Sequence, residues 1–302
     1  MPLMRTTIVS ALIALAATVT LAACGHQSAP ASGAAARVTP RVVSAGRPAT
    51  AMATPGMPML GMPMIPDGGL TNSADGFTLA LRTPVLPAGR PAVLRFQITA
   101  DGKPVTRFEP DMTKLMHLYL IRSDLNSFQH VHPVMAPDGT WSVRLAAHTH
   151  GSYRIFTTFT AVHATGEPAA VVLSAPVTIP GAPATAPLPP PSSTATVDGY
   201  TLTIVGTVMA DTQHTLTVTI TKDGKPVTSL QPYLDSYAHL SAFRQGNLAF
   251  AHLHPEQAAT SAHGGPELTF RTMFSQPGTY RMFLQFQTSG TLHTAAFTFP
   301  VS

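Results

Sequence analysis

Gly151-Ser-Tyr-Arg-Ile-Phe-Thr-Thr-Phe159 is a segment that the chain uses twice, because it returns 127 residues later as Gly278-Thr-Tyr-Arg-Met-Phe-Leu-Gln-Phe286. In both copies, aromatic and aliphatic residues interleave with polar ones. This alternation is typical of a half-buried β-strand, whose successive side chains point to opposite faces of a sheet. The segment therefore predicts a duplicated β domain with this strand at its core.

Two further blocks repeat upstream of this strand, both with an offset of 122 residues. Asp101-Gly-Lys-Pro-Val-Thr106 recurs as Asp223-Gly-Lys-Pro-Val-Thr228, and Phe128-Gln-His-Val-His-Pro133 recurs as Phe250-Ala-His-Leu-His-Pro255. The offset then grows from 122 to 127, so the second copy carries five extra residues, which we place within 256–265.

The remaining sequence predicts the fold of each copy. About seven short runs of β-branched and aromatic residues are separated by Gly, Pro, Asp or Asn, and no long stretch has a helical period. This pattern predicts an all-β chain with two tandem immunoglobulin-like antiparallel β-sandwiches. We assign them to residues 71–180 and 197–302, joined by a proline-rich linker at 181–196.

The composition argues against several classes of protein. The net charge of +4 comes from dispersed basic residues, so we expect no nucleic-acid partner. The single cysteine excludes an internal disulfide and a blue-copper site with a thiolate ligand. No nucleophile motif, phosphate-binding loop or pair of acids at a shared spacing is present, so we expect no enzymatic activity.

The N-terminal residues 1–23 have the features of a secretory signal, with Arg5 ahead of the apolar run 8–21. The end of this run, Leu21-Ala-Ala-Cys24, resembles the bacterial lipobox, in which the cysteine is lipidated. We therefore expect Cys24 to anchor the protein to the cell membrane or outer membrane, on the extracytoplasmic face. The alternative is an ordinary signal peptide with an incidental cysteine.

Residues 24–70 are rich in Ala, Pro and Gly and predict a flexible tether. The tether contains closely spaced methionines, namely Met57, Met59, Met62 and Met64. Thioethers are soft ligands that suit Cu(I), so this run is a candidate secondary metal site. The alternative is a low-complexity linker in which Met has no ligand role.

The histidines are the main candidate functional residues. Each copy has one histidine followed by a His-x-His-Pro, which gives the sets His117, His130, His132 and His239, His252, His254. Because a strand has a period of two residues, both histidines of each His-x-His leave the same face. A two-residue turn at Gln245-Gly246 would pair His239 with His252, and the same count would pair His117 with His130.

Three imidazoles on one face can bind copper or zinc, so we regard each set as a candidate metal site. The alternative is that the histidines are buried structural groups, because Phe128 and Phe250 share their face. His148 and His150 form another His-x-His, which is found in the first copy alone and which we weigh less as a site.

Residues 116–133, Met-His-Leu-Tyr-Leu-Ile-Arg-Ser-Asp-Leu-Asn-Ser-Phe-Gln-His-Val-His-Pro, resemble a family of bacterial secreted proteins and lipoproteins with His-x-His-Pro sandwich domains. More loosely, the architecture is similar to CopC-type and YtkA-like extracytoplasmic domains. The resemblance implies metal handling at the cell envelope. The second copy departs from the motif, since Asp124-Leu125 is replaced around Gln245-Gly246.

Together these features predict a membrane-anchored extracytoplasmic lipoprotein that binds or buffers a transition metal, with copper favoured over zinc. Its partners would be the membrane and a metal-trafficking or envelope protein. The alternative function is a metal-free envelope scaffold or a lipoprotein that binds a protein partner.

Overall fold

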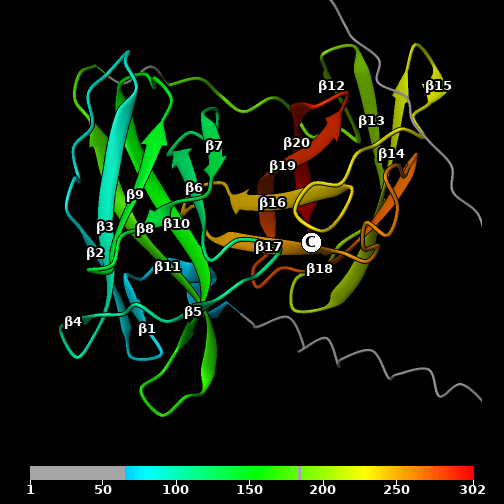
Figure 1. Cartoon of the computed structure of the whole chain (residues 1–302). Coiled ribbons are helices and arrows are strands. Elements are labelled where there is room, and N and C mark those ends of the chain that lie inside the picture. Colours follow the sequence, from blue (N-terminus) through cyan, green and yellow to red (C-terminus); the bar gives the residue numbers. More distant parts are fainter. Residues whose placement is uncertain (1–64, 183–184) are drawn as a thin grey trace, which may run out of the picture. The chain divides into compact units, whose positions relative to one another are not determined.

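The computed structural model describes residues 65–182 and 185–302 (Figure 1). The predictions for the signal peptide, Cys24 and the methionines at 57–64 lie outside these residues. Apart from one 3-10 turn, η1 (Pro66–Gly69), the regular structure described is all β. Within the described ranges, no helix is both long and apolar enough to cross a membrane.

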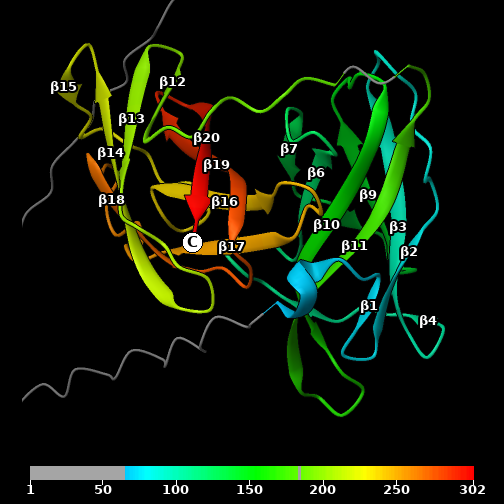
Figure 2. The same ribbon diagram turned by 180° about the vertical axis from the view of Figure 1, so that it is seen from behind.

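The first sandwich has two antiparallel sheets. One sheet has the order β1 (Ser73–Ala74), β2 (Phe77–Leu81), β3 (Ala92–Ala100), β9 (Thr140–Leu145), β8 (Val134–Met135), with β4 (Lys103–Pro104) paired to β3. The other has the order β11 (Pro168–Ile179), β10 (Gly151–Val162), β6 (His117–Arg122), β7 (Phe128–Val131), with β5 (Phe108–Glu109) paired to β10. Figure 2 shows β10 and β11 side by side from behind.

The second sandwich repeats this plan, but its strands form one continuous hydrogen-bonded path. The order is β12 (Thr194–Val197), β13 (Tyr200–Val205), β14 (Gln213–Lys222), β18 (Glu267–Met273), β17 (Phe250–Pro255), β16 (Ala238–Arg244), β19 (Gly278–Thr288), β20 (Thr291–Val301), with β15 (Lys225–Pro226) on β14. The path is continuous because β17 pairs with β16 and then with β18. The predicted tandem of immunoglobulin-like β-sandwiches is confirmed.

The His-x-His-Pro segments lie where the chain passes from one sheet to the other. In the first sandwich, β7 pairs with β6, whereas β8, which begins just after Pro133, pairs with β9. Strands that change sheets make the corners of a sandwich. His132 therefore lies at a corner, directly beyond the end of β7.

Each sandwich has its own apolar core, and the repeated strand lies in it. Tyr153 and Ile155 belong to the core of the first sandwich, and Tyr280 and Met282 to that of the second. Residues on the other face of the same strands, such as Phe156 and Phe283, belong to a third cluster that contains residues of both sandwiches. The two sandwiches belong to one compact unit of the chain.

The third cluster explains the composition of β6. Leu118 and Leu120 face the first core, whereas Tyr119 and Ile121 face the third cluster, so every residue of β6 is buried. A strand buried on both faces has a nearly continuous apolar sequence rather than an alternating one. His117 shares the face of Tyr119 and Ile121, which turns its ring toward the other sandwich.

The hairpin predicted at Gln245-Gly246 is wrong in length. Phe243 pairs with Phe250, and the amide of Arg244 donates to the carbonyl of Ala249, which leaves four residues in the loop. The fourth, Leu248, has φ 65° and a buried side chain in the third cluster. Burial of this leucine stabilises the wider loop despite the cost of a positive φ.

The register of both hairpins is consequently two residues away from the predicted one. His252 pairs with Ser241 rather than His239, and His130 pairs with Tyr119 rather than His117. A shift of one residue would have moved each histidine to the opposite face, but a shift of two keeps the face unchanged. The predicted pairs are wrong, and the predicted shared face of His117 and His130 holds.

Candidate metal centre

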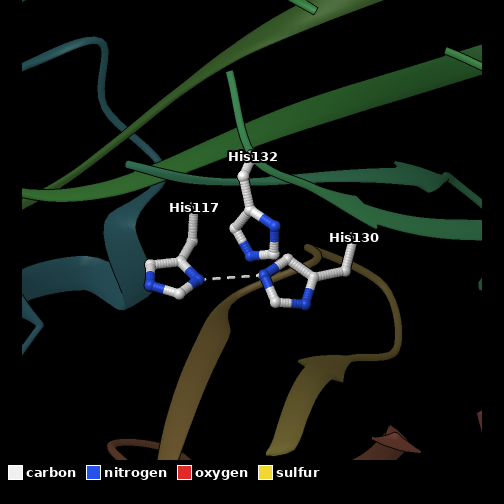
Figure 3. Close-up of side chains that lie close together, drawn as sticks. All are labelled: His117, His130 and His132. Atoms are coloured by element: carbon white, nitrogen blue, oxygen red, sulfur yellow. Dashed lines mark hydrogen bonds between the residues drawn. The ribbon is translucent and has the colours of Figure 1, made fainter. Parts of the chain in front are cut away.

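His117, His130 and His132 come together in the first sandwich and point toward one another (Figure 3). One possible ligand nitrogen from each ring lies within 4.8 Å of the other two. The His132 ring stands edge-on to both partners, with ring centres 4.9 Å from His117 and 4.8 Å from His130. Within the described ranges, no cysteine, aspartate or glutamate joins this group.

The hydrogen-bond partners fix which nitrogen of each ring carries hydrogen. His117 Nε2 lies 3.1 Å from the backbone oxygen of Asp111, which can only accept, so Nε2 donates and Nδ1 keeps its lone pair. His130 Nδ1 lies 2.7 Å from Gln285 Oε1. In the orientation of the Gln285 amide in this structure, its nitrogen donates to Thr294 Oγ1 and its oxygen faces His130, so His130 Nδ1 donates and Nε2 keeps its lone pair.

These two lone pairs face each other. The distance between His117 Nδ1 and His130 Nε2 is 3.1 Å, the contact drawn as a dashed line in Figure 3. Because His117 carries its hydrogen on Nε2 and His130 on Nδ1, no hydrogen lies between His117 Nδ1 and His130 Nε2. His132 Nε2 is also buried and has no hydrogen-bond partner within the described ranges. A buried acceptor without a partner costs about 1–3 kcal/mol, so the group favours a cation at its centre.

Electrostatics keep the three rings neutral. Burial lowers the pKa of His117, although the hydrogen bond to the Asp111 backbone opposes this shift. Burial, together with His117 and His132, holds the pKa of His130 well below its ordinary value. Burial, His117 and Lys114 lower the pKa of His132 to about 3. Neutral imidazole is the form that binds metals, and a bridging proton is not retained at neutral pH.

The distances suit one ion after a small adjustment. Copper and zinc bind imidazole nitrogen at about 2.0–2.1 Å, which places two ligand nitrogens of one ion roughly 3.3–3.6 Å apart. The His117–His130 distance of 3.1 Å is close to this range. His132, at the corner of the sandwich, would have to move by about 1 Å, which a side-chain torsion can supply.

Residues of the second sandwich and of β6 enclose the group. The ring of His239 stacks on His130 with centres 4.8 Å apart, and its Nε2 shares a 2.9 Å hydrogen bond with the Tyr119 hydroxyl. The ring of Tyr119 also stacks on the ring of His130, with centres 4.4 Å apart. Burial raises the pKa of Tyr119 well above its ordinary value, so the hydroxyl stays protonated and uncharged.

The sequence placed His239 at the centre of a second site, but the structure places it against the first. The side chains of His252 and His254 lie outside the described residues, and their backbones pair with Ser241 and Arg271. The other His-x-His is separate from the cluster: His148 bonds to Ser127 and Gln129, and His150 bonds to the backbone oxygen of Pro180.

Sequence reasoning missed Asp111, Tyr119 and Gln285 as members of the centre. Tyr119 could have been found, because it lies two residues after His117 on the same strand face. Asp111 acts through its backbone oxygen, which leaves no signal in the sequence. Gln285 comes from the other sandwich, 155 residues from His130, and no local pattern marks it.

Comparisons with solved structures find distant likenesses. The chain is 15% identical to the Escherichia coli adhesin FdeC, over 76% of this chain and 65% of that one, with a TM-score of 0.26. It is 14% identical to a bacterial ice-binding adhesin, over 75% and 64%, with a TM-score of 0.22. The chain thus spans less than two thirds of either protein. TM-scores this low support no conclusion about function.

No protein of curated function is significantly similar to the chain. The family model for a domain of unknown function, DUF8832, matches at residues 72–175 and again at 195–302. The two matches cover both sandwiches and most of the chain. This protein therefore belongs to the DUF8832 family and carries the domain twice.

Proposed function

We propose that this protein is an extracytoplasmic binding protein that holds one transition-metal ion, copper or zinc, between His117, His130 and His132. The observation that carries the proposal is the 3.1 Å contact between two nitrogens whose rings both donate outward. A metal ion satisfies both lone pairs and that of His132 at once.

The partners of the outward nitrogens support the proposal. Metal-binding histidines usually donate their second N–H to a carbonyl or carboxylate, which fixes the ring and makes it a better ligand. His117 does so to the Asp111 carbonyl and His130 to the Gln285 amide oxygen. The ion would supply positive charge, while these two groups hold the rings in the ligating tautomer.

The N-terminal sequence supports a place at the envelope. A signal-like run ending in Leu21-Ala-Ala-Cys24 fits a lipid anchor on the outer side of a membrane. Met57, Met59, Met62 and Met64 would then form a soft, weaker binding segment in the tether. A metal-trafficking protein of the envelope is the partner that this arrangement fits.

A titration of the metal-free purified protein tests the proposal. We expect one Cu or Zn ion per chain to bind in a histidine-dependent way. We expect His132→Ala to weaken this binding by roughly 100-fold or more. Loss of a hydrogen-bond partner of a ligand typically costs about 10–100-fold in affinity, and loss of the ligand itself should cost more. The matched control is His263→Ala, since His263 is an exposed histidine in the second sandwich. The absence of binding, or equal affinity in both variants, would overturn the proposal.

The second candidate function is a metal-free envelope scaffold that binds a protein partner. It is favoured by the burial of His117 and His239, which are 0% and 1% exposed, and by the bonds Tyr119–His239 and His130–Gln285 between the sandwiches. In this case the histidines stabilise the packing of the sandwiches. Stability that does not change when Cu or Zn is added would support it over metal binding.

A further inference from the structure

From the charges around the centre we infer that its preferred occupant is a soft monovalent cation, Cu(I), for which Ag(I) is a redox-inert probe. This inference rests on the proposed function and adds the charge and oxidation state of the ion. It starts from a property of the ligand group, which contains three neutral imidazoles and, within the described ranges, no thiolate or carboxylate.

Among the described residues, the charged neighbours of the group offset each other. The ionisable neighbours that act on the three rings are Asp111, which acts on His117, and Lys114, which acts on His117 and His132. One is an acid and the other a base, so their charges offset each other. Of the other enclosing groups, Tyr119 and Gln285 are uncharged, and His239 is a buried imidazole that is 1% exposed.

Because the group is buried, its lack of charge affects which ion it binds. His117 is 0% exposed and His130 is 7% exposed, so an ion between them loses much of its hydration. The cost of desolvation grows with the square of the charge, and is therefore about four times larger for a dication than for a monocation. An uncharged, enclosed ligand group therefore offsets this cost less fully for Zn²⁺ than a group that contains a carboxylate or a thiolate.

The number of donors points the same way. Zn²⁺ sites in proteins are almost always four-coordinate, and an open fourth position is filled by water. Within the described ranges, the group offers three nitrogens, on His117, His130 and His132. Cu(I) and Ag(I) form stable three-coordinate complexes without a bound water, so these three nitrogens are a sufficient ligand set for them.

The test compares affinities for Ag(I), Cu(I) and Zn(II) without oxygen, by competition with chromophoric chelators. Thioethers also bind Ag(I), so the methionines of the tether are first replaced, with Met57→Leu, Met59→Leu, Met62→Leu and Met64→Leu. In this background, His132→Ala gives the baseline without the centre. We expect Ag(I) and Cu(I) to bind the histidine centre at least about 100-fold more tightly than Zn(II).

A charge substitution gives an independent readout. Gln285→Glu keeps the shape of the side chain and places a negative charge beside His130. We expect it to tighten Zn(II) more than Ag(I), by about 10-fold in the ratio of the two affinities, whereas Gln285→Met leaves that ratio unchanged.

The outcomes separate the two proposals. Equal or tighter binding of Zn(II) in the methionine-free background would overturn the monovalent preference and leave metal binding intact. A protein that binds none of the three ions through His132 would overturn the proposed function and this inference together.

Discussion

Gln285 supports the proposed metal centre without being one of its ligands. Its amide oxygen accepts from His130 Nδ1 and so holds the hydrogen on the outer nitrogen. We predict that Gln285→Met weakens metal binding about 10–100-fold, as loss of such an orienting partner typically does. The measurement is the same competition titration.

The control for this variant is Gln287→Met, on the same strand and two residues away. Its backbone oxygen accepts from Gln231, and a substitution leaves that bond in place. If both variants bind metal equally well, Gln285 has no orienting role.

The depressed pKa values of the three histidines give a stability prediction with a definite sign. The pKa of His132 falls from 6.5 to about 3 on folding, and those of His117 and His130 are lowered as well. The unfolded chain then binds more protons between these values, so stability rises with pH across the window. For the metal-free protein we predict full stability above about pH 6.5 and progressive loss toward pH 3.

Urea unfolding at several pH values measures this dependence. His132→Ala removes one of the groups and should flatten the curve between pH 6.5 and 4, whereas the exposed-site control His263→Ala should not. Identical slopes in the two variants would contradict the assigned role of His132.

At the level of the elements, the packing of β7 against β19 is the clearest target. Phe128 and Phe283 stack with ring centres 4.0 Å apart and planes 5° from parallel, and Phe283 is 6% exposed. We predict that Phe283→Ala lowers the free energy of unfolding by about 3–5 kcal/mol, because it opens a cavity between the sandwiches. Chemical denaturation measures the change.

Val205→Ala is the comparison, because Val205 is 63% exposed and such a change should stay within about 0.5 kcal/mol. A cost for Phe283→Ala as small as that of the control would mean that the stacked pair contributes little to the stability of the chain.

The elements also show what the sequence could and could not predict. The repeats predicted the sandwiches with the repeated strand at their cores, and Tyr153 and Tyr280 of that strand lie there. The prediction that this strand is half-buried is wrong, because its other face, with Phe156 and Phe283, is buried in the third cluster. The loop after β16 was missed because Leu248 adopts a positive φ that its residue type rarely takes, stabilised by burial in a cluster shared by both sandwiches. Such a tertiary effect has no local signature.

For the whole molecule, the repeat explains how the sandwiches meet. Phe128 and Phe250 are equivalent in the repeat, as are Phe156 and Phe283. Phe128 stacks on Phe283, and Phe156 packs on Phe250 with ring centres 5.5 Å apart. The two copies therefore contact each other through equivalent surfaces, while Tyr119 in one copy corresponds to Ser241 in the other. The three described ligands all belong to the first copy, whereas the groups that contact them come from both copies.

We predict from this arrangement that metal stabilises both sandwiches. At a free metal concentration 100 times the dissociation constant, the gain is about 2.7 kcal/mol. Because His130 is tied to Gln285, amide hydrogen exchange should slow in β10 and in β19 alike. Slower exchange in β10 alone would show that the second sandwich is not coupled to the site.

The register of the β6–β7 hairpin has a consequence for insertions and deletions. His130 and His132 face the centre because a loop of four residues, 123–126, follows the Arg122–Ser127 backbone hydrogen bond and sets the register of the Ile121–Phe128 pair. Adding or removing two residues there would slide the histidines along β6 but keep them on the same side. Adding or removing one would rotate them into the apolar core of Leu118 and Leu120. The hairpin can therefore vary in size, but the parity of its length is fixed.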